Sequence, residues 1–293
     1  MKRGALIAAA AAAGLVFGAG AAHGAVVDGP TPGGHDFQQP ATEIMREIIG
    51  FHNGVLLPII VAISVFVLAL LLWVMIRYNR AANPTPKKFT HNMLVEVIWT
   101  VIPVLILVGI AWKSFPLIYK QEQIPPAEYT LKVTGNSWRW EFAYPDLGVN
   151  ITSNLLDEET ARAQGRPYLL ATDTPVYVPV GAVVRVIVTS NDVIHSFAVP
   201  AFGIKEDAIQ GRTNETWFRA DRTGVFYGQC SELCGINHAY MPVEVHVVSR
   251  EEFNRWVVAQ GGTLAASDAA PAPAADGEQP DTQPAGPAAT PTR

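Results

Sequence analysis

The sequence has few cysteines and no excess of basic residues. Its 293 residues include two cysteines, 21 lysines and arginines, and 26 aspartates and glutamates, for a formal net charge of −5. A chain of this charge lacks the basic surface that binds nucleic acid, so no nucleic-acid partner is expected. The two cysteines do not form the C-x-x-C-H sequence that attaches a c-type haem, which excludes that cofactor.

Charge is also scarce in two long apolar runs. Residues 54–76 contain no charged side chain, and a helix of this length crosses the hydrocarbon core of a bilayer. Residues 93–112 form a second run, interrupted by Glu96 and Pro103. Neighbouring helices can satisfy the carbonyl that a proline leaves free. We therefore predict a multi-pass membrane protein with spanning helices at 54–76 and 93–117.

Residues 1–24 have the pattern of a signal peptide, with two basic residues before an Ala-rich apolar stretch. Residues 25–53 then form an N-terminal periplasmic segment, with a short interfacial helix expected at 41–53. The loop at 77–92 carries four basic residues, which places it in the cytoplasm. The signal peptide requires the same orientation, with both ends of the mature chain in the periplasm.

The remaining chain is expected to be an all-β domain at 120–260. Short β-branched and alternating runs are separated by Gly, Pro and Asn, which is typical of a Greek-key β-sandwich or barrel. A loop or short helix is expected at 155–166 and a helix at 251–258. Residues 261–293 are almost wholly small and polar, which predicts a disordered tail.

A cluster of metal-ligand residues lies within this domain. Cys230, Cys234, His238 and Met241 have the spacing C-x3-C-x3-H-x2-M. Thiolate, imidazole and thioether are the ligands of copper electron-transfer sites, whereas zinc rarely takes methionine. Two thiolates four residues apart can bridge a pair of metal ions, and His195 upstream is the candidate nitrogen ligand for the second ion. A disulfide between the cysteines is the alternative in an exported domain.

At these residues the sequence resembles subunit II of bacterial cytochrome c oxidase, a haem–copper terminal oxidase. The resemblance covers about residues 45–258. It rests on His91-Asn92 with Glu96-Val97-Ile98-Trp99-Thr100, Trp138-Arg139-Trp140, Asn191-Asp192-Val193-Ile194-His195-Ser196-Phe197 and Gly228-Gln229-Cys230-Ser231-Glu232-Leu233-Cys234-Gly235. It implies a cupredoxin-like fold for the β domain, in the periplasm of a bacterium whose inner membrane holds the two helices.

The resemblance also implies the metal sites. Two copper ions would be held by His195, Cys230, the backbone carbonyl of Glu232, Cys234, His238 and Met241. The side chain of Glu232 would bind Mg²⁺ or Mn²⁺ shared with subunit I, and carboxylate oxygen suits such an ion. His246, on the polar side of an alternating strand, is interpreted as a surface histidine.

The family further implies electron and proton routes. Electrons would enter from cytochrome c at Trp138, and acidic residues at Asp173 and Asp192 would help the basic donor to dock. Glu96 would lie at the mouth of a proton-uptake path into subunit I, and a carboxylate in a spanning segment is by itself a functional candidate. Arg139 stands where many members have an aromatic residue, which puts the docking patch in doubt.

The implied function is a subunit that passes electrons from periplasmic cytochrome c to haem in subunit I. Oxygen would be reduced to water there, with proton translocation. The alternatives are a quinol-oxidase-type subunit II, which lacks the copper ligands, and a membrane-anchored copper carrier, which would not explain Glu96. The dinuclear-copper domain of a nitrous-oxide-reducing enzyme would need a large repeat domain, for which the chain has no room.

Overall fold

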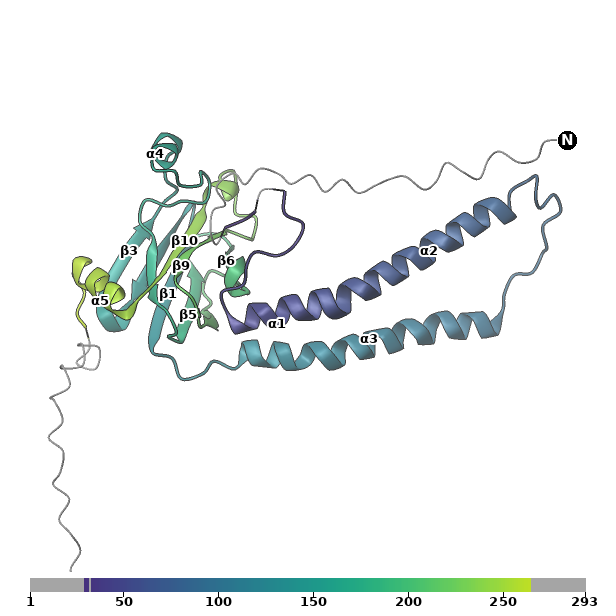
Figure 1. Cartoon of the computed structure of the whole chain (residues 1–293), viewed down its shortest axis with the longest axis horizontal. Helices are drawn as coiled ribbons and strands as arrows, with labels where there is room; N and C mark the ends of the chain where they lie inside the picture. Colours follow the sequence, from purple (N-terminus) through teal and green to yellow (C-terminus); the bar gives the residue numbers. More distant parts are fainter. Residues whose placement is uncertain (1–28, 32, 265–293) are drawn as a thin grey trace, which may run out of the picture.

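The computed structural model describes residues 29–31 and 33–264. The predicted signal peptide and nearly all of the predicted tail lie outside the described residues. Two long helices extend as a hairpin from one side of a β domain (Figure 1). The helical part consists of α1 Glu43–Phe51, a π-helical segment His52–Leu56, α2 Leu57–Arg77 and α3 Met93–Glu122.

The hairpin helices differ from the predicted bounds at both ends. The π-helical segment joins α1 to α2, so the expected interfacial helix and the first spanning helix form one continuous helix, Glu43–Arg77. The second helix begins at Met93 as predicted but continues past residue 117 to Glu122. It ends shortly before Pro125, because a residue that precedes proline disfavours the helical conformation. Both helices are long and apolar enough to cross a membrane.

Among the described residues, the β domain contains ten strands and two α-helices. The strands are β1 Tyr129–Asn136, β2 Arg139–Tyr144, β3 Val149–Ser153, β4 Val176–Pro179, β5 Val184–Ser190, β6 His195–Val199, β7 Ile204–Ala208, β8 Asn214–Phe218, β9 Gly224–Gln229 and β10 Pro242–Val248. The helices are α4 Glu158–Ala163 and α5 Arg250–Ala259, close to where short helices were expected.

Three sheets enclose one apolar core. Their strand orders are β3-β2-β1-β5-β8, β4-β10-β9 and β6-β7. Val133 on β1, Val186 on β5 and Val245 on β10 are buried in the same cluster, which places two sheets face to face. The parallel pairs β1–β5 and β4–β10 require crossovers between the layers. The expectation of two apolar helices followed by a cupredoxin-like β-sandwich is confirmed.

The domain is fixed to the start of the hairpin. The N–H of Ala41 donates to the carbonyl of Ala201 at 2.8 Å, and the carbonyl of Ala41 accepts from the N–H of Asp221 at 2.9 Å. Lys120 on α3 makes ion pairs of 2.7 and 2.6 Å with Glu43 and Glu47 on α1. These contacts hold the two helices together at the end of the hairpin that meets the domain.

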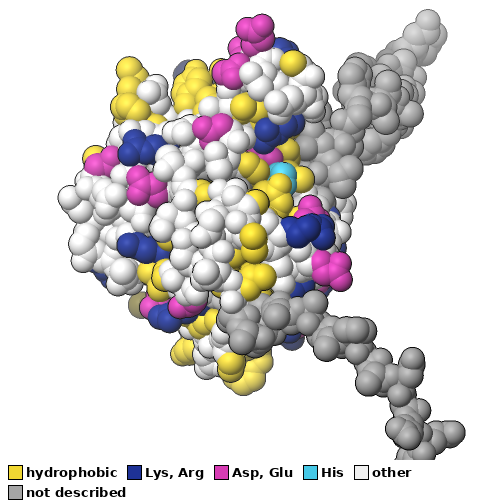
Figure 2. Space-filling view, turned by 90° about the vertical axis from the view of Figure 1, so that its left-hand side faces the viewer, with side chains coloured by type: hydrophobic (Ala, Val, Ile, Leu, Met, Phe, Trp, Pro, Cys, Tyr) yellow, Lys and Arg dark blue, Asp and Glu magenta, His cyan; other side chains and the backbone are white. Residues whose placement is uncertain are grey.

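The end of the domain remote from the hairpin carries both signs of charge (Figure 2). Acidic and basic side chains alternate over this face without a field of one sign. This face therefore offers no concentrated acidic surface to a basic protein partner, and an acidic docking patch would have to lie on another face.

Candidate metal centre

The candidate ligands come from two places in the fold. His195 begins β6, and its side chain is fully buried. The other candidates lie on the loop 230–241 between β9 and β10. The N–H of Cys230 donates to the carbonyl of Met241 at 3.0 Å, which closes this loop at its base. The N–H of Ser231 donates to the carbonyl of Ser196 at 3.0 Å, which ties the loop to β6 beside the histidine.

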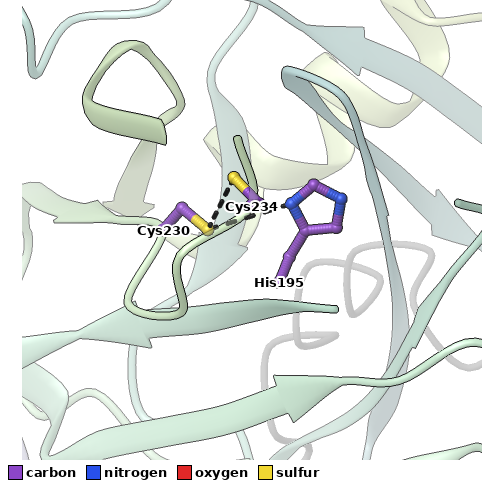
Figure 3. Close-up of side chains that lie close together, drawn as sticks. All are labelled: His195, Cys230 and Cys234. Atoms are coloured by element: carbon purple, nitrogen blue, oxygen red, sulfur yellow. Dashed lines mark hydrogen bonds between the residues drawn. The ribbon is translucent and has the colours of Figure 1, made fainter. Parts of the chain in front are cut away.

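The two sulfurs and the imidazole point toward one another (Figure 3). Cys230 Sγ lies 3.8 Å from Cys234 Sγ and 3.9 Å from His195 Nδ1. The ligand atoms of all three residues lie within 4.8 Å of one another. A disulfide would bring the sulfurs to about 2.05 Å. Both cysteines are free, so the alternative of a disulfide is not what this structure forms.

Further donors complete the set. His238 Nδ1 lies 3.5 Å from Cys234 Sγ. The carbonyl of Glu232 lies 3.3 Å from Cys230 Sγ. Met241 is buried in the same apolar cluster as both cysteines. Soft sulfur and imidazole donors in a buried, preformed site fit copper better than a hard cation.

The two thiols differ in acidity. Burial opposes ionisation of Cys230, but the hydrogen bond with His195 and two backbone contacts outweigh burial and lower the pKa to about 6. For Cys234, burial and the charge of Cys230 raise the pKa to about 12. In the metal-free protein one sulfur is therefore ready to bind at neutral pH, and the other must lose a proton when a metal takes it.

Asp192 orients the buried imidazole. Its Oδ1 lies 2.8 Å from His195 Nε2, and its Oδ2 accepts the N–H of Ser137 at 2.7 Å. A carboxylate on Nε2 holds the proton there and leaves Nδ1 to face the sulfurs. Burial opposes ionisation of Asp192, but this hydrogen bond and backbone N–H donors hold its pKa well below the usual range. Sequence reasoning missed this contact, although the three-residue spacing from His195 was visible.

Trp138 and Trp140 lie in different surroundings. Trp138 precedes β2 and is half-buried, and its Nε1 donates to the carbonyl of Cys234 at 3.2 Å. The indole of Trp138 thus lies directly on the loop that holds both cysteines. Trp140 is fully buried, and its ring packs edge-on against the His195 ring with 6.0 Å between the ring centroids.

Three further predicted residues lie outside the cluster of donors. The side chain of Glu232 is exposed between the two cysteines. Asp173 is exposed, and its carboxylate accepts the N–H and side-chain amide of Asn154 at 2.9 and 3.0 Å. Glu96 lies in the first turn of α3, at the end of the hairpin remote from the domain, and accepts the N–H of Asn92 at 3.2 Å (Figure 1).

The expectation that His246 is a surface histidine is wrong. His246 is half-buried, and its Nε2 lies 2.8 Å from Oε1 of Glu244, whose side chain is 1% exposed. Glu244 also binds Arg166 at 2.6 Å and the N–H of Thr172 at 2.7 Å. The alternation of buried apolar and exposed polar residues along β10 fails at Glu244. This carboxylate is buried because Arg166, Thr172 and His246 satisfy its hydrogen bonds.

These observations define a class of protein. Two helices able to span a membrane carry a cupredoxin-like domain, and this domain presents a buried sulfur and imidazole donor set suited to copper. These features fit a membrane-anchored protein with a candidate copper site.

Comparison with known proteins identifies the family. Residues 129–248 match the family model described as Cytochrome C oxidase subunit II, periplasmic domain, and residues 30–117 match its transmembrane domain. The chain belongs to the cytochrome c oxidase subunit II family, as the sequence motifs predicted. This places it among the subunits of haem–copper oxidases, which are oxidoreductase complexes, and the family implies a copper centre.

Individual relatives agree. A probable cytochrome c oxidase subunit 2 of Rickettsia bellii is 47% identical over 237 residues, covering 80% of this chain and 87% of the relative. Cytochrome c oxidase subunit 2 of Cereibacter sphaeroides is 43% identical over 265 residues, covering 84% and 87%. The crystal structure of the periplasmic domain of subunit II from Bradyrhizobium japonicum is 49% identical, covers 47% of this chain and 97% of that domain, and has a TM-score of 0.44.

Proposed function

We propose that this chain is the electron-accepting subunit of a proton-translocating cytochrome c oxidase. Periplasmic cytochrome c delivers electrons to a centre of two copper ions in the β domain, and haem in subunit I receives them. Oxygen is reduced to water in subunit I, so this chain contains no oxygen-reducing site. The two helices lie in the bacterial inner membrane, with the copper domain in the periplasm.

The observation that carries this proposal is the gathering of two imidazole nitrogens around the two sulfurs. The two sulfurs are 3.8 Å apart, His195 Nδ1 lies 3.9 Å from Cys230 Sγ, and His238 Nδ1 lies 3.5 Å from Cys234 Sγ. Two thiolates and two imidazoles would supply enough soft donors to hold two copper ions rather than one. When bound there, such a copper pair would supply one-electron transfer with little reorganisation of the site. The carbonyl of Glu232 and the thioether of Met241 are the remaining donors.

The exposed side chain of Glu232 is assigned to a second metal. Its backbone carbonyl faces Cys230 while its carboxylate is exposed, so one residue can serve two sites. Carboxylate oxygen suits Mg²⁺ or Mn²⁺. The other ligands of this ion would come from subunit I, across the surface where Leu233 and Ile236 are 76% and 87% exposed. Such apolar exposure beside the site favours a protein partner there.

Electron entry is assigned to Trp138. The indole is half-buried, so it is reachable from outside, and its N–H binds the carbonyl of the ligand Cys234. Replacing Trp138 with Phe should slow reduction by cytochrome c by more than about tenfold, because the indole contact is lost, while the copper spectrum stays the same. Rapid-mixing kinetics would measure this rate. An unchanged rate would remove Trp138 from the route.

The deciding experiment is electron paramagnetic resonance with copper quantification on the purified full-length chain. We expect about two coppers per chain and a mixed-valence signal shared by two nuclei. Cys234→Ser should abolish that signal, whereas His246→Ala, a histidine outside the donor set, should preserve it. A single-copper spectrum would favour a copper carrier. Absence of copper binding would contradict the proposal and favour a quinol-oxidase-type subunit.

A further inference from the structure

Gly135 occupies a position where glycine is unfavourable. It lies in β1, the middle strand of the five-stranded sheet, and pairs with Trp140 of β2 on one side and Ser190 of β5 on the other. Alternation along β1 places residue 135 on the same face as Leu131 and Val133, which are buried in the core. A glycine inside a strand weakens the strand and leaves a gap in the core unless another group occupies that space.

The imidazole of His195 occupies the space next to Gly135. A Cβ atom added to Gly135 would lie 2.7 Å from Cδ2, 3.0 Å from Cγ and 3.1 Å from Cβ of His195. The backbone of Gly135 is not in the left-handed region that favours glycine, so its conformation alone does not require glycine. Residue 135 must instead lack a side chain because the His195 ring fills that space, and real Cβ atoms do not approach other heavy atoms to 2.7 Å.

The ring has little freedom to retreat from an added Cβ atom. Asp192 holds Nε2, Cys230 faces Nδ1, and the ring of Trp140 meets the imidazole edge-on. Moving the ring away from Gly135 would alter at least one of these contacts. Tight packing on several sides transmits a displacement of a few tenths of an ångström to the ligand atom.

We propose that Gly135 is a positioning residue for the copper ligand His195. The bare Cα of Gly135 sets how deeply the imidazole enters the core, and therefore where Nδ1 stands relative to the sulfurs. The proposal has two parts. The steric part, that a side chain at residue 135 would displace the His195 ring, concerns this chain alone. The second part, that this displacement alters copper binding, rests on the proposed function. The two parts are tested separately.

The steric part is tested on the copper-free, full-length chain in detergent with a double-mutant cycle. Gly135→Ala should lower the melting temperature of the domain by roughly 5 °C, because an extra methyl group overpacks the core. In a His195→Ala background the same substitution should leave the melting temperature unchanged or raise it, since the ring is gone. An equal loss in both backgrounds would overturn the proposal.

The copper part is tested on the copper-loaded chain by electron paramagnetic resonance. Gly135→Ala should change the copper hyperfine pattern and lower copper retention in a chelator competition by about tenfold or more. Gly50→Ala is the matched control, because a Cβ atom there meets nothing within 4 Å. A spectrum and retention identical to wild type in Gly135→Ala would overturn this part. A wild-type chain that binds no copper would instead defeat the proposed function and leave the steric cycle standing.

Discussion

At the residue scale, the candidate centre depends on how one buried imidazole is held. His195 is fully buried and is contacted by a carboxylate, a sulfur, an indole and a bare glycine Cα. A neutral imidazole can bind metal through either nitrogen, so the group that binds the other nitrogen decides which one is free. Asp192 makes that choice here, and its carboxylate is therefore part of the site as well as part of the surface.

Replacing each of the two predicted docking acids should therefore affect copper affinity differently. Asp192→Ala should lower copper affinity about tenfold, because loss of a carboxylate that orients a histidine ligand typically costs that much. Asp173→Ala removes the same charge from a residue that binds only Asn154 among its described hydrogen bonds, so copper affinity should not change. Competition with a copper chelator measures both. Equal affinities in the two variants would remove the positioning role from Asp192.

At the element scale, a buried carboxylate ties a loop to β10. Glu244 binds Arg166 and Thr172 from the loop after α4, and it binds His246 on its own strand. Gln229, next to Cys230, donates to the carbonyl of Leu169 in the same loop at 3.4 Å. The loop after α4 is thereby packed beside β9, the strand that leads into the loop 230–241.

The stability supplied by Glu244 should depend on pH. Burial by itself would raise its pKa, but hydrogen bonds from His246 and Thr172 and the charge of Arg166 lower it below 4.5. A group with a lowered folded pKa stabilises the fold above its unfolded pKa and loses this effect as the pH falls. Glu244→Gln should cost roughly 2–4 kcal/mol of unfolding free energy at pH 7, because Arg166 loses its partner.

Urea unfolding of the wild type and the Glu244→Gln variant at several pH values would measure this difference. It should shrink progressively as the pH falls below the ordinary pKa of a glutamate, because the unfolded chain then takes up a proton that the folded carboxylate, with its lowered pKa, does not bind until the pH is lower still. Glu158→Gln is a suitable control, since its exposed ion pair with Arg162 contributes little. A difference that stays constant down to acid pH would show that the charge of Glu244 is not what stabilises the loop.

Helix α1 is joined to the domain through its N-cap. Thr42 is 2% exposed, its Oγ1 accepts the N–H of Met45 at 3.1 Å, and the same hydroxyl donates to the carbonyl of Phe202 at 2.8 Å. Thr42→Ala should destabilise the domain by about 1–2 kcal/mol, because a buried carbonyl and a helix N–H both lose a partner. Denaturant unfolding measures this loss. Thr42→Ser keeps the hydroxyl, and a loss as large as that of alanine would point to the methyl group instead.

At the scale of the whole molecule, the proposed proton and electron functions lie at opposite ends. The loop 230–241 with the candidate metal ligands belongs to the domain, whereas Glu96 lies in the first turn of α3, at the far end of the hairpin (Figure 1). The contact with Asn92 shows that Glu96 also closes the first turn of α3, where a negative charge is favoured by the helix dipole. A substitution at Glu96 can therefore act through proton uptake or through the helix end.

Glu96→Ala in the assembled oxidase should slow proton-coupled turnover and leave the copper spectrum unchanged. Glu96→Gln separates the two roles, because glutamine keeps an acceptor for the N–H of Asn92 but cannot ionise. Equal slowing in both variants would assign the effect to the ionisable group. Oxygen consumption with reduced cytochrome c measures turnover. Full activity in Glu96→Gln would contradict a role in proton uptake.

Local patterns in the sequence were enough to predict the class of fold. The two long apolar runs predicted the hairpin, because a bilayer-spanning helix needs a continuous apolar segment. The spacing of Cys230, Cys234, His238 and Met241 predicted the chemistry of the site, because all four lie on one short loop. Helix ends were less predictable. The ion pairs of Lys120 with α1 support the last turns of α3, and no local pattern contains them.

By itself, then, the sequence determined the two long apolar helices, the β-rich domain and the candidate ligand types of the loop 230–241, since each depends on residues close together in the chain. Only the tertiary structure decided how His195 is held. Asp192 faces its Nε2, Trp140 packs against the ring, and Gly135 leaves it space, although Gly135 is 60 residues away along the chain. It also decided that Glu244 is buried. Such placements arise from strands that meet across the sandwich, and the alternation of residues along a single strand does not predict contacts between strands.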